Sequence, residues 1–448
     1  MAGNPRQLAG SPESGVSGVK PREDLATFKG YLSPRPPLEA RLNANELPFP
    51  IPDAWREELV AELRALQINR YPDIASRALK EALASHLQVQ PENVFVARGS
   101  NEVLQSLLLA FGGPTRKAML FEPTYQMHSR IAVITGTAVV VGERNESFGI
   151  DPAVMSELCQ RHDPEVLFIC SPNNPTGIVE DDGVIHSALE ATSGLVVLDA
   201  AYDEFSGRDS VSRWAAEFGR SSDNIAGTER MAIVRTFSKA WSLAGLRLGY
   251  LVASPDVVAA CELVSLPYHM DGFVQAAGVV VLRHAGEVAG RVQAVVEERE
   301  RVYRAMQGMP LRVWPSRANF LFFRLEGGAG EVVHELERRS IAVRDFSAAP
   351  GTESCLRVTI GLPRENDRFL EALAEVLAAP DMSAALAPTA EASRSFATPR
   401  PRDLPAGGSG GEATCGEIAG RDIAGGQIAG GDNIGGGMAG SGEMAGRY

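Results

Sequence analysis

Short, nearly continuous apolar segments recur through the middle of the chain and alternate with stretches of helical character, including predicted helices at 74–87 and 102–111. The segments predict strands at 94–97, 118–121, 138–141, 166–170, 195–198, 231–234 and 247–252. A strand that is apolar along its whole length is typical of a parallel sheet buried under helices. We therefore expect an α/β fold whose large domain holds a mostly parallel seven-stranded sheet, covered by helices on both faces.

The 448 residues exceed what one hydrophobic core usually contains, so we expect a second domain. After the large sheet come three more predicted strands and two predicted helices, at 318–323, 341–344, 356–360, 286–308 and 366–378. They predict a smaller α+β domain over 281–380, next to a large domain over 74–280. Residues 26–73 are expected to form an N-terminal arm and part of the small domain.

Both ends of the chain have the composition of disordered segments. Residues 1–25 are rich in Ser, Gly, Pro and charge, and residues 381–448 are rich in Ala, Pro and Ser and then in Gly. From Gly416 the sequence nearly repeats every five residues, so a structured glycine solenoid is the alternative for the tail. The small number of repeats and the rarity of large apolar side chains favour disorder.

Composition excludes several classes of function. A net charge of −13 argues against nucleic acid or a membrane surface as the main partner. The five cysteines, Cys159, Cys170, Cys261, Cys355 and Cys415, have no paired spacing, which favours reduced thiols in a cytoplasm over disulfides or a metal site. No apolar run reaches about 18 residues, and the first residues lack a secretory pattern. We therefore expect a cytoplasmic protein without a membrane span.

Polar sequences follow several of the predicted strands at the point where each strand ends. They are the segments at 122–125, 171–177, 199–202 and 236–250. In parallel α/β sheets, ligands bind beyond the carboxyl ends of the strands. The sequence therefore predicts a binding site at this edge of the sheet.

Lys239 lies between two apolar strands, among small residues, and Arg247 follows eight positions later. A desolvated lysine at a strand end has a lowered pKa and becomes a nucleophile that can hold an aldehyde cofactor as a Schiff base. The hydroxyl of Ser238 and the guanidinium of Arg247 could then bind the phosphate of that cofactor. The alternative is an ordinary exposed lysine at the end of a strand.

Two other strand ends have alternatives of the same kind. The segment Gly99-Ser100-Asn101 opens a predicted helix and could bind an anion there, or Ser100 or Asn101 could simply cap the helix. Asp199 ends an apolar strand and is expected to be buried, so it requires a positive or donating partner. A protonated pyridine nitrogen or a structural arginine would serve.

Three further polar side chains are candidates at the same edge. Tyr202 could reach the ligand of Asp199 or could be a packed tyrosine. Asn174 stands in a segment with two prolines and could present its amide to a ligand or serve in a turn. Tyr125 could stack on an aromatic ring or pack in the core.

Together these segments resemble the pyridoxal-phosphate-dependent aminotransferases of fold type I over residues 31–377. The resemblance rests on Glu122-Pro123-Thr124-Tyr125, on Ser171 to Gly177, on Asp199 with Tyr202, and on Ser238-Lys239-Ala240 continued by Leu243-Ala244-Gly245-Leu246-Arg247 and Gly249-Tyr250. It implies pyridoxal 5′-phosphate as the cofactor and no metal. Lys239 would bind the cofactor and move the proton between Cα and C4′.

The resemblance also assigns roles to the other candidates. Asp199 would hold the pyridine nitrogen protonated, Tyr202 and Asn174 would bind the phenolic oxygen, and Tyr125 would stack on the ring. The cofactor phosphate would be bound by Gly99, Ser100, Asn101, Ser238, Arg247 and, from a partner subunit, Tyr71. The protein would therefore be a homodimer.

Three other segments, 42–46, 69–73 and 343–345 with 356–359, are similar to histidinol-phosphate aminotransferases. That similarity implies amino transfer between L-histidinol phosphate and 2-oxoglutarate in histidine biosynthesis. Arg357 and Arg344 would bind the two anionic groups of the substrates, Tyr31 would close over the substrate, and Asn45 would contact it.

Four positions depart from the pattern of the family. Asn101 stands where Asp is frequent, Trp241-Ser242 replaces Phe-Gly, Leu47-Pro48-Phe49 replaces Asn-Pro-Tyr, and His269 follows Pro267-Tyr268 where Asn is common. The last three lie towards the substrate side and leave other substrates open. The alternatives are an aminotransferase for aromatic amino acids, a lyase resembling phosphothreonine decarboxylase, and a regulator that binds the cofactor without turnover.

Overall fold

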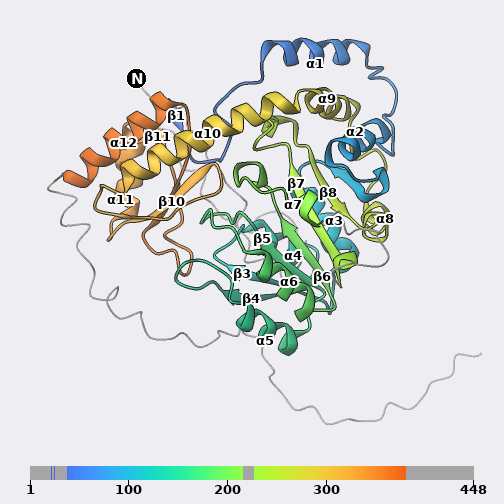
Figure 1. Ribbon diagram of the computed structural model, residues 1–448, viewed down its shortest axis with the longest axis horizontal. Helices are drawn as coiled ribbons and strands as arrows, with labels where there is room; N and C mark the ends of the chain where they lie inside the picture. The colour runs from blue at the N-terminus through green and yellow to red at the C-terminus, as the bar shows by residue number, and fades with distance from the viewer. Residues whose placement is uncertain (1–21, 23–24, 26–37, 215–226, 380–448) are drawn as a thin grey trace, which may run out of the picture. The chain divides into compact units, whose positions relative to one another are not determined.

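The computed structural model describes residues 22, 25, 38–214 and 227–379 (Figure 1). Its described residues belong to one compact unit, Met1–Thr398. The predicted disorder of 1–25 and 381–448 concerns segments that are almost wholly outside the described residues, and so does the solenoid alternative for the tail. Tyr31 and Cys415 also lie outside them.

The large sheet has seven strands in the order β2-β8-β7-β6-β5-β3-β4. The strands are β2 (Val94–Ala97), β3 (Lys117–Glu122), β4 (Ala138–Glu143), β5 (Val166–Cys170), β6 (Leu195–Asp199), β7 (Met231–Thr236) and β8 (Gly249–Ala253). The pairs from β7 to β4 are parallel, and β8 is antiparallel to both of its neighbours. The mostly parallel seven-stranded sheet is confirmed.

Alternate residues of these strands belong to separate hydrophobic cores, so the sheet is covered on both faces, as predicted. Met119 packs into one core and its neighbour Leu120 into the other, and both are fully buried. The helices of this region are α2 (Arg77–Leu87), α3 (Ser100–Phe111), α4 (Met127–Ile134), α5 (Pro152–His162), α6 (Asp182–Ala191), α7 (Ser210–Trp214), α8 (Pro255–Val264) and α9 (Gly272–Arg283). Short 3₁₀ helices lie at Pro91–Asn93, Asp203–Phe205, Thr228–Arg230 and Ala244–Leu246.

A second, antiparallel sheet follows, with the strand order β12-β13-β10-β9. Its strands are β9 (Arg312–Val313), β10 (Phe320–Arg324), β12 (Arg344–Asp345) and β13 (Cys355–Thr359). The helices here are α10 (Ala285–Met306), α11 (Ala329–Arg338) and α12 (Pro363–Ala378). Figure 1 shows α10 as one long helix that runs from α9 towards α12.

The prediction of a single strand at 341–344 is wrong, because the segment divides between two sheets. β11 (Ile341–Ala342) pairs in parallel with β1 (Ala40–Arg41) of the N-terminal arm, and β12 pairs with β13. A strand that changes partners after two residues leaves no periodic signal in the sequence. The β1–β11 pairing attaches the arm to the chain's C-terminal part, about 300 residues away.

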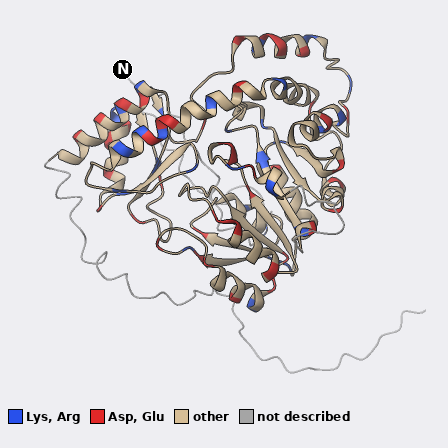
Figure 2. Ribbon diagram, in the orientation of Figure 1, with Lys and Arg blue, Asp and Glu red and all other residues tan. Residues whose placement is uncertain are grey.

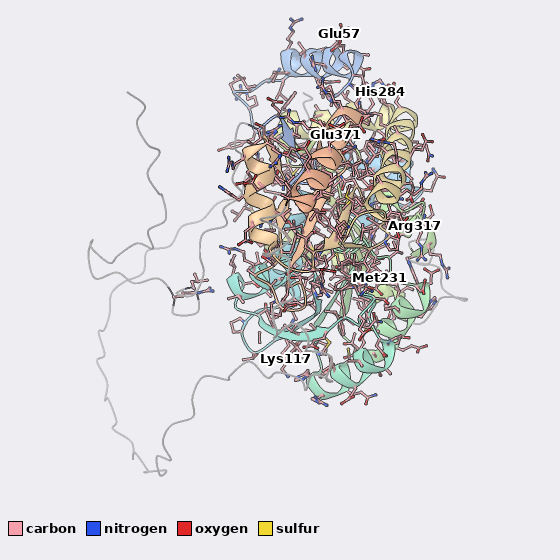
Figure 3. All side chains as sticks on the ribbon, turned by 90° about the vertical axis from the view of Figure 1, so that its left-hand side faces the viewer. Glu57, Lys117, Met231, His284, Arg317 and Glu371 are labelled. Carbon is pink, nitrogen blue, oxygen red and sulfur yellow. The ribbon has the colours of Figure 1, made fainter. Side chains whose placement is uncertain are left out.

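Helix α1 (Asp53–Ala65), which was not predicted, lies within the predicted arm. Trp55 and Leu59, one helical turn apart, are its buried residues, and Asp53 stands in its first turn. Trp55 stacks on His284 at 5.0 Å between ring centroids, and His284 is labelled next to α1 in Figure 3. Two buried residues on an otherwise polar helix give only a weak periodic pattern.

Charged residues lie on the helices, and the strands of the large sheet are mostly uncharged (Figure 2). Among the described helices, none combines the length and the apolar character that crossing a membrane requires. Nor do the described residues gather three or more His, Cys, Asp or Glu side chains in an arrangement that could hold a metal ion.

Candidate active site

Five of the predicted site residues lie at one edge of the large sheet. β2, β3, β5, β6 and β7 run in the same direction, so their carboxyl ends share an edge. Gly99 follows β2, Tyr125 follows β3, Asn174 follows β5, Asp199 ends β6 and Lys239 follows β7. The register of the sheet therefore places five candidates together.

Lys239 faces the N-terminal arm. Its Nζ donates to the carbonyl oxygens of Ala44 at 3.2 Å and Asn45 at 3.1 Å, and it lies 5.7 Å from the ring of Tyr202. Burial, with a further contribution from the charge of Arg357, lowers the pKa of Lys239 to about 7. A large fraction of this amine is therefore neutral near pH 7, which excludes the ordinary exposed lysine.

The start of α3 forms a close-packed anion cradle with Arg247. Gly99 has φ +85°, and a Cβ there would lie 2.6 Å from Nη2 of Arg247. A Cβ on Gly249 would lie 2.4 Å from the backbone nitrogen of Ser100, so both glycines are needed for this approach. Arg247 donates to Oγ of Ser238 at 3.0 Å. Backbone N–H groups, a guanidinium and a hydroxyl thus meet at a helix N-terminus.

The capping alternative for this segment is wrong. Gly99 occupies the N-cap position of α3 without a side-chain capping hydrogen bond, so neither Ser100 nor Asn101 caps the helix. Asn101 instead accepts a hydrogen bond from the hydroxyl of Tyr125 at 3.0 Å. This contact joins the segments that follow β2 and β3.

Asp199 is buried beside His128, a residue that was not among the predicted site residues. Nε2 of His128 lies 2.9 Å from Oδ2 of Asp199, and the backbone N–H of Ala201 donates to Oδ1 at 3.2 Å. The His128 ring is fully buried and stacks on Phe168 at 4.8 Å. Among the described residues no arginine pairs with Asp199, so the structural arginine proposed as its partner is not found there. The sequence feature that could have indicated His128 as a site residue is its position three residues after Tyr125.

Tyr202 and Asn45 are hydrogen-bonded to each other. Nδ2 of Asn45 donates to the Tyr202 hydroxyl at 2.9 Å, and burial raises the pKa of Tyr202 to about 12. Asn45 is itself held through its side chain and backbone by Thr359 of β13 and through its carbonyl by Asn319. Tyr202 is therefore protonated at neutral pH, and its hydroxyl is held by Asn45.

Arg357 of β13 joins the two sheets. It donates to Oδ1 of Asn174 and to the carbonyl of Asn43, the latter at 3.0 Å, between the rings of Phe320 and Phe346. Arg344 of β12 is its direct cross-strand partner. Side chains that are directly opposite point to the same face, and like charges in this arrangement repel each other. The pair is therefore suited to an anion.

Tyr71 lies elsewhere on the surface of the chain. It is 80% exposed and stacks on Tyr268 at 4.3 Å. The neighbouring His269 had no predicted role. Its Nε2 lies 3.0 Å from the carbonyl oxygen of Val96, and its ring stacks on Phe95. These contacts make His269 an anchor for the segment between α8 and α9.

A buried ion-pair network, also missed from the sequence, lies behind Lys239. Arg235 of β7 pairs with Asp203 at 3.1 Å and with Glu204 at 2.9 Å. The indole N–H of Trp241 donates to the same Glu204 at 3.1 Å. The network ties the segment that carries Lys239 to the segment that carries Tyr202.

Comparison with known proteins decides the family. The model of the family "Aminotransferase class I and II" matches residues 40–373. The chain belongs to this aminotransferase family. A histidinol-phosphate aminotransferase from Frankia casuarinae is 42% identical to it, over 81% of this chain and 91% of that protein. One from Corynebacterium efficiens is 38% identical, over 82% of this chain and 97% of that protein.

Solved structures confirm the fold of this aminotransferase. The histidinol-phosphate aminotransferase of Sinorhizobium meliloti, in complex with pyridoxal-5′-phosphate, has a TM-score of 0.67 and 23% identity, over 76% of this chain and 91% of that one. The L-threonine-O-3-phosphate decarboxylase of Porphyromonas gingivalis has a TM-score of 0.63 and 24% identity, over 75% and 98%. One fold thus serves both a transaminase and a lyase.

Enzymes of this family use pyridoxal 5′-phosphate, and the chemistry of the site fits that cofactor. The cradle of Gly99, Ser100, Ser238 and Arg247 suits a phosphate. The amine of Lys239 suits an aldehyde, and the buried carboxylate of Asp199 suits a protonated ring nitrogen. The chain is accordingly a pyridoxal-phosphate-dependent transaminase.

Proposed function

We propose that the protein transfers an amino group between L-histidinol phosphate and 2-oxoglutarate in L-histidine biosynthesis. The observation that carries this proposal is the similarity to histidinol-phosphate aminotransferases, at 36–42% identity over more than nine-tenths of each relative. The cross-strand pair Arg344 and Arg357 supports it, because both amino-group partners bring anionic groups besides the reacting centre.

In this proposal the residues of the sheet edge bind the cofactor and move one proton. When bound, pyridoxal phosphate supplies an electron-withdrawing ring that stabilises negative charge at the substrate Cα. Lys239 binds the aldehyde and carries the proton between Cα and C4′, for which an amine with a pKa of about 7 is well matched. Asp199, oriented by His128, keeps the ring nitrogen protonated.

The other cofactor contacts follow the resemblance. Tyr202 and Asn174 donate to the phenolic oxygen, and Tyr125 stacks on the ring. Gly99, Ser100, Asn101, Ser238 and Arg247 bind the phosphate. Arg357 is already held by Asn174 and Asn43, so its guanidinium is oriented before substrate arrives.

On the substrate side, Arg357 binds a carboxylate or the phosphate of the substrate in bidentate fashion, and Arg344 binds the second anion. Asn45 positions Tyr202 and contacts the substrate. Tyr31, proposed from the resemblance, closes over the bound substrate.

We also propose that the chain is divided into a large domain at 74–280 and a small domain at 281–380. Residues 26–73 form the N-terminal arm and part of the small domain.

We propose a homodimer in which Tyr71 reaches the phosphate site of the neighbouring subunit. Tyr71 stacks on Tyr268, and large apolar side chains close to them in the sequence are also exposed: Ile68 and Ile74 near Tyr71, Leu263 near the end of α8 and Leu266 after it. Leu263 is 87% exposed, and a surface rich in exposed apolar side chains favours contact with another protein. A second copy of the chain is the proposed cover.

We propose the cytoplasm as the compartment. All four cysteines among the described residues are free and buried, and burial raises the pKa of each thiol. Thiols of this kind need no oxidising compartment for stability.

A single half-reaction tests the function. The purified holoenzyme is mixed with L-histidinol phosphate alone, and the absorbance of the cofactor is followed. We expect conversion to pyridoxamine phosphate, much faster than with phenylalanine. Preference for phenylalanine would favour the aromatic aminotransferase, carbon dioxide from phosphothreonine would favour the lyase, and no conversion by any of the three would leave a regulator that only binds the cofactor.

A further inference from the structure

Two departures from the family pattern, far apart in the sequence, contact each other in the structure. Oγ of Ser242, in the segment that follows Lys239, donates to the carbonyl oxygen of Phe49 at 3.2 Å. Ser242 has φ +59°, a backbone conformation that glycine adopts freely and other residues adopt at a cost. In the family pattern this position is commonly glycine, which has no hydroxyl and could not make the contact with Phe49.

Arg291 of α10 completes this contact. Its Nη2 donates to the carbonyl of Phe49 at 2.8 Å, to the carbonyl of Pro50 at 2.7 Å and to Oγ of Ser242 at 3.0 Å. The guanidinium lies 5.6 Å from the ring of Phe49 and 5.6 Å from the ring of Trp55. One guanidinium thus joins three parts of the chain: the arm, helix α10 and the segment 238–245, which we call the lysine segment.

The same stretch of arm also supplies acceptors to the reacting groups. The carbonyls of Ala44 and Asn45 accept from Lys239, and the carbonyl of Asn43 accepts from Arg357. Residues 43–50 are therefore held at one end by Lys239 and Arg357 and at the other by Arg291. The short length of the segment limits how far its two ends can move relative to each other.

A cavity of about 350 Å³ lies between the arm and the lysine segment. Its walls are Glu46, Leu47, Pro48, Phe49 and Pro50 on one side and Ser238, Ser242, Ala244 and Gly245 on the other, with Arg41 at its rim. The Ser242–Phe49 contact joins these two walls. Ser238, a proposed phosphate ligand, is also among the lining residues.

We propose that Arg291 and Ser242 are positioning residues that clamp the arm 43–50 to the lysine segment and so keep its carbonyls against Lys239 and Arg357. The inference rests on the proposed roles of Lys239 and Arg357. It gives a function to the hydroxyl of Ser242, which stands where the family commonly has glycine.

The test uses the full-length protein with Arg291→Met, Arg291→Lys, Ser242→Gly and, as the matched control, Arg304→Met. Arg304 is an exposed arginine on the same helix, bonded to the carbonyl of Glu300. Hydrogen exchange of the backbone amides of residues 42–50 is measured in each holoenzyme. We expect about tenfold faster exchange in Arg291→Met, a smaller increase in Ser242→Gly and in Arg291→Lys, and none in the control.

A second readout follows Lys239 itself. The cofactor-free variants are mixed with pyridoxal phosphate over a range of pH, and the rate of cofactor capture is recorded. Burial is the main cause of the low pKa of Lys239, and a loosened arm admits water to its amine. We therefore expect the pH at which the capture rate is half-maximal to rise by about 0.5 pH unit or more in Arg291→Met.

Unchanged exchange and an unchanged capture midpoint in Arg291→Met would overturn the clamp. If Arg291→Met fails to fold, Ser242→Gly decides, because it removes one hydroxyl and relaxes the backbone. Equal exchange at 42–50 in Ser242→Gly and the unmodified protein then overturns the proposal. Neither readout involves a substrate, so the clamp and the proposed function can fail separately.

Discussion

The proposed cofactor side and the proposed substrate side of this active site are built in different ways. On the cofactor side, Gly99, Asn174, Asp199 and Lys239 each follow or end a strand of one sheet, and strand register positions them. On the substrate side, Arg344 and Arg357 come from the small antiparallel sheet, and Asn45 comes from the arm.

The two sides are joined by a few hydrogen bonds between side chains and backbone carbonyls. Asn174 accepts from Arg357, and the arm carbonyls accept from Lys239 and Arg357. A site built on a sheet is positioned by many backbone hydrogen bonds, whereas these links depend on single side chains. Variants of the cofactor side should therefore abolish chemistry, and variants of the substrate side should alter affinity and selectivity.

Replacing Lys239 with alanine should have the largest effect. We expect amino transfer to fall by about 10⁴-fold, the upper range for loss of a positioned general acid–base group, with loss of the covalently bound cofactor from the absorbance spectrum. The control is Lys117→Ala, because Lys117 starts β3 at the opposite edge of the sheet and bonds the carbonyl of His162. Catalytic turnover by Lys239→Ala would refute the role of the lysine.

Arg357→Lys should weaken both substrates. A lysine cannot hold Asn174, the carbonyl of Asn43 and a substrate anion in one planar fork, so we expect KM to rise about tenfold for each substrate, about 1.4 kcal/mol. Arg344→Lys should raise KM for the substrate that carries the second anion and leave the other nearly unchanged. Steady-state kinetics with each substrate varied in turn measures both. Equal effects of the two variants on both substrates would contradict the division of roles.

The pH dependence of cofactor binding probes the junction between the two sides. Because the pKa of Lys239 is lowered to about 7, capture of pyridoxal phosphate by the cofactor-free protein should rise with pH around a midpoint near 7. The charge of Arg357 contributes to that lowering, so Arg357→Met should move the midpoint to higher pH. A midpoint near the ordinary lysine value in the unmodified protein would refute the burial of the amine.

The same pKa carries a prediction for stability. Between pH 7 and the ordinary lysine pKa, the unfolded chain binds more protons at residue 239 than the folded protein does. The free energy of unfolding of the cofactor-free protein should therefore increase with pH across that window, and Lys239→Met should reduce the slope. Urea unfolding at several pH values measures it.

Trp241→Phe should have the smallest effect, on stability. It removes the hydrogen bond to Glu204 from the network behind Lys239 and should lower the free energy of unfolding by about 1 kcal/mol. Trp314→Phe is a suitable control, since Trp314 is also buried but its indole N–H has no hydrogen-bond partner among the described residues. An equally large decrease in the free energy of unfolding of Trp314→Phe would show that the loss of ring volume, and not the loss of the hydrogen bond, causes the destabilisation.

Much of the fold was predictable because its strands are apolar along their whole length. Every strand of the large sheet was found within two residues of its predicted start. Helix boundaries were less accurate: α2 begins at Arg77, three residues later than predicted, and α12 begins three residues earlier, at Pro363. Helix α1 and the division of 341–344 between two sheets were missed, because neither produces a strong periodic pattern.

The sequence by itself determined which side chains would gather at the sheet edge, because in a parallel sheet the residue after each strand lies at a known place. Lys239, Asp199 and Gly99 could be identified in this way. Only the tertiary structure decided what surrounds them: His128 against Asp199, the arm carbonyls against Lys239, and Arg291 against Ser242. Such contacts join residues more than 40 positions apart through side-chain geometry, for which a linear sequence has no period.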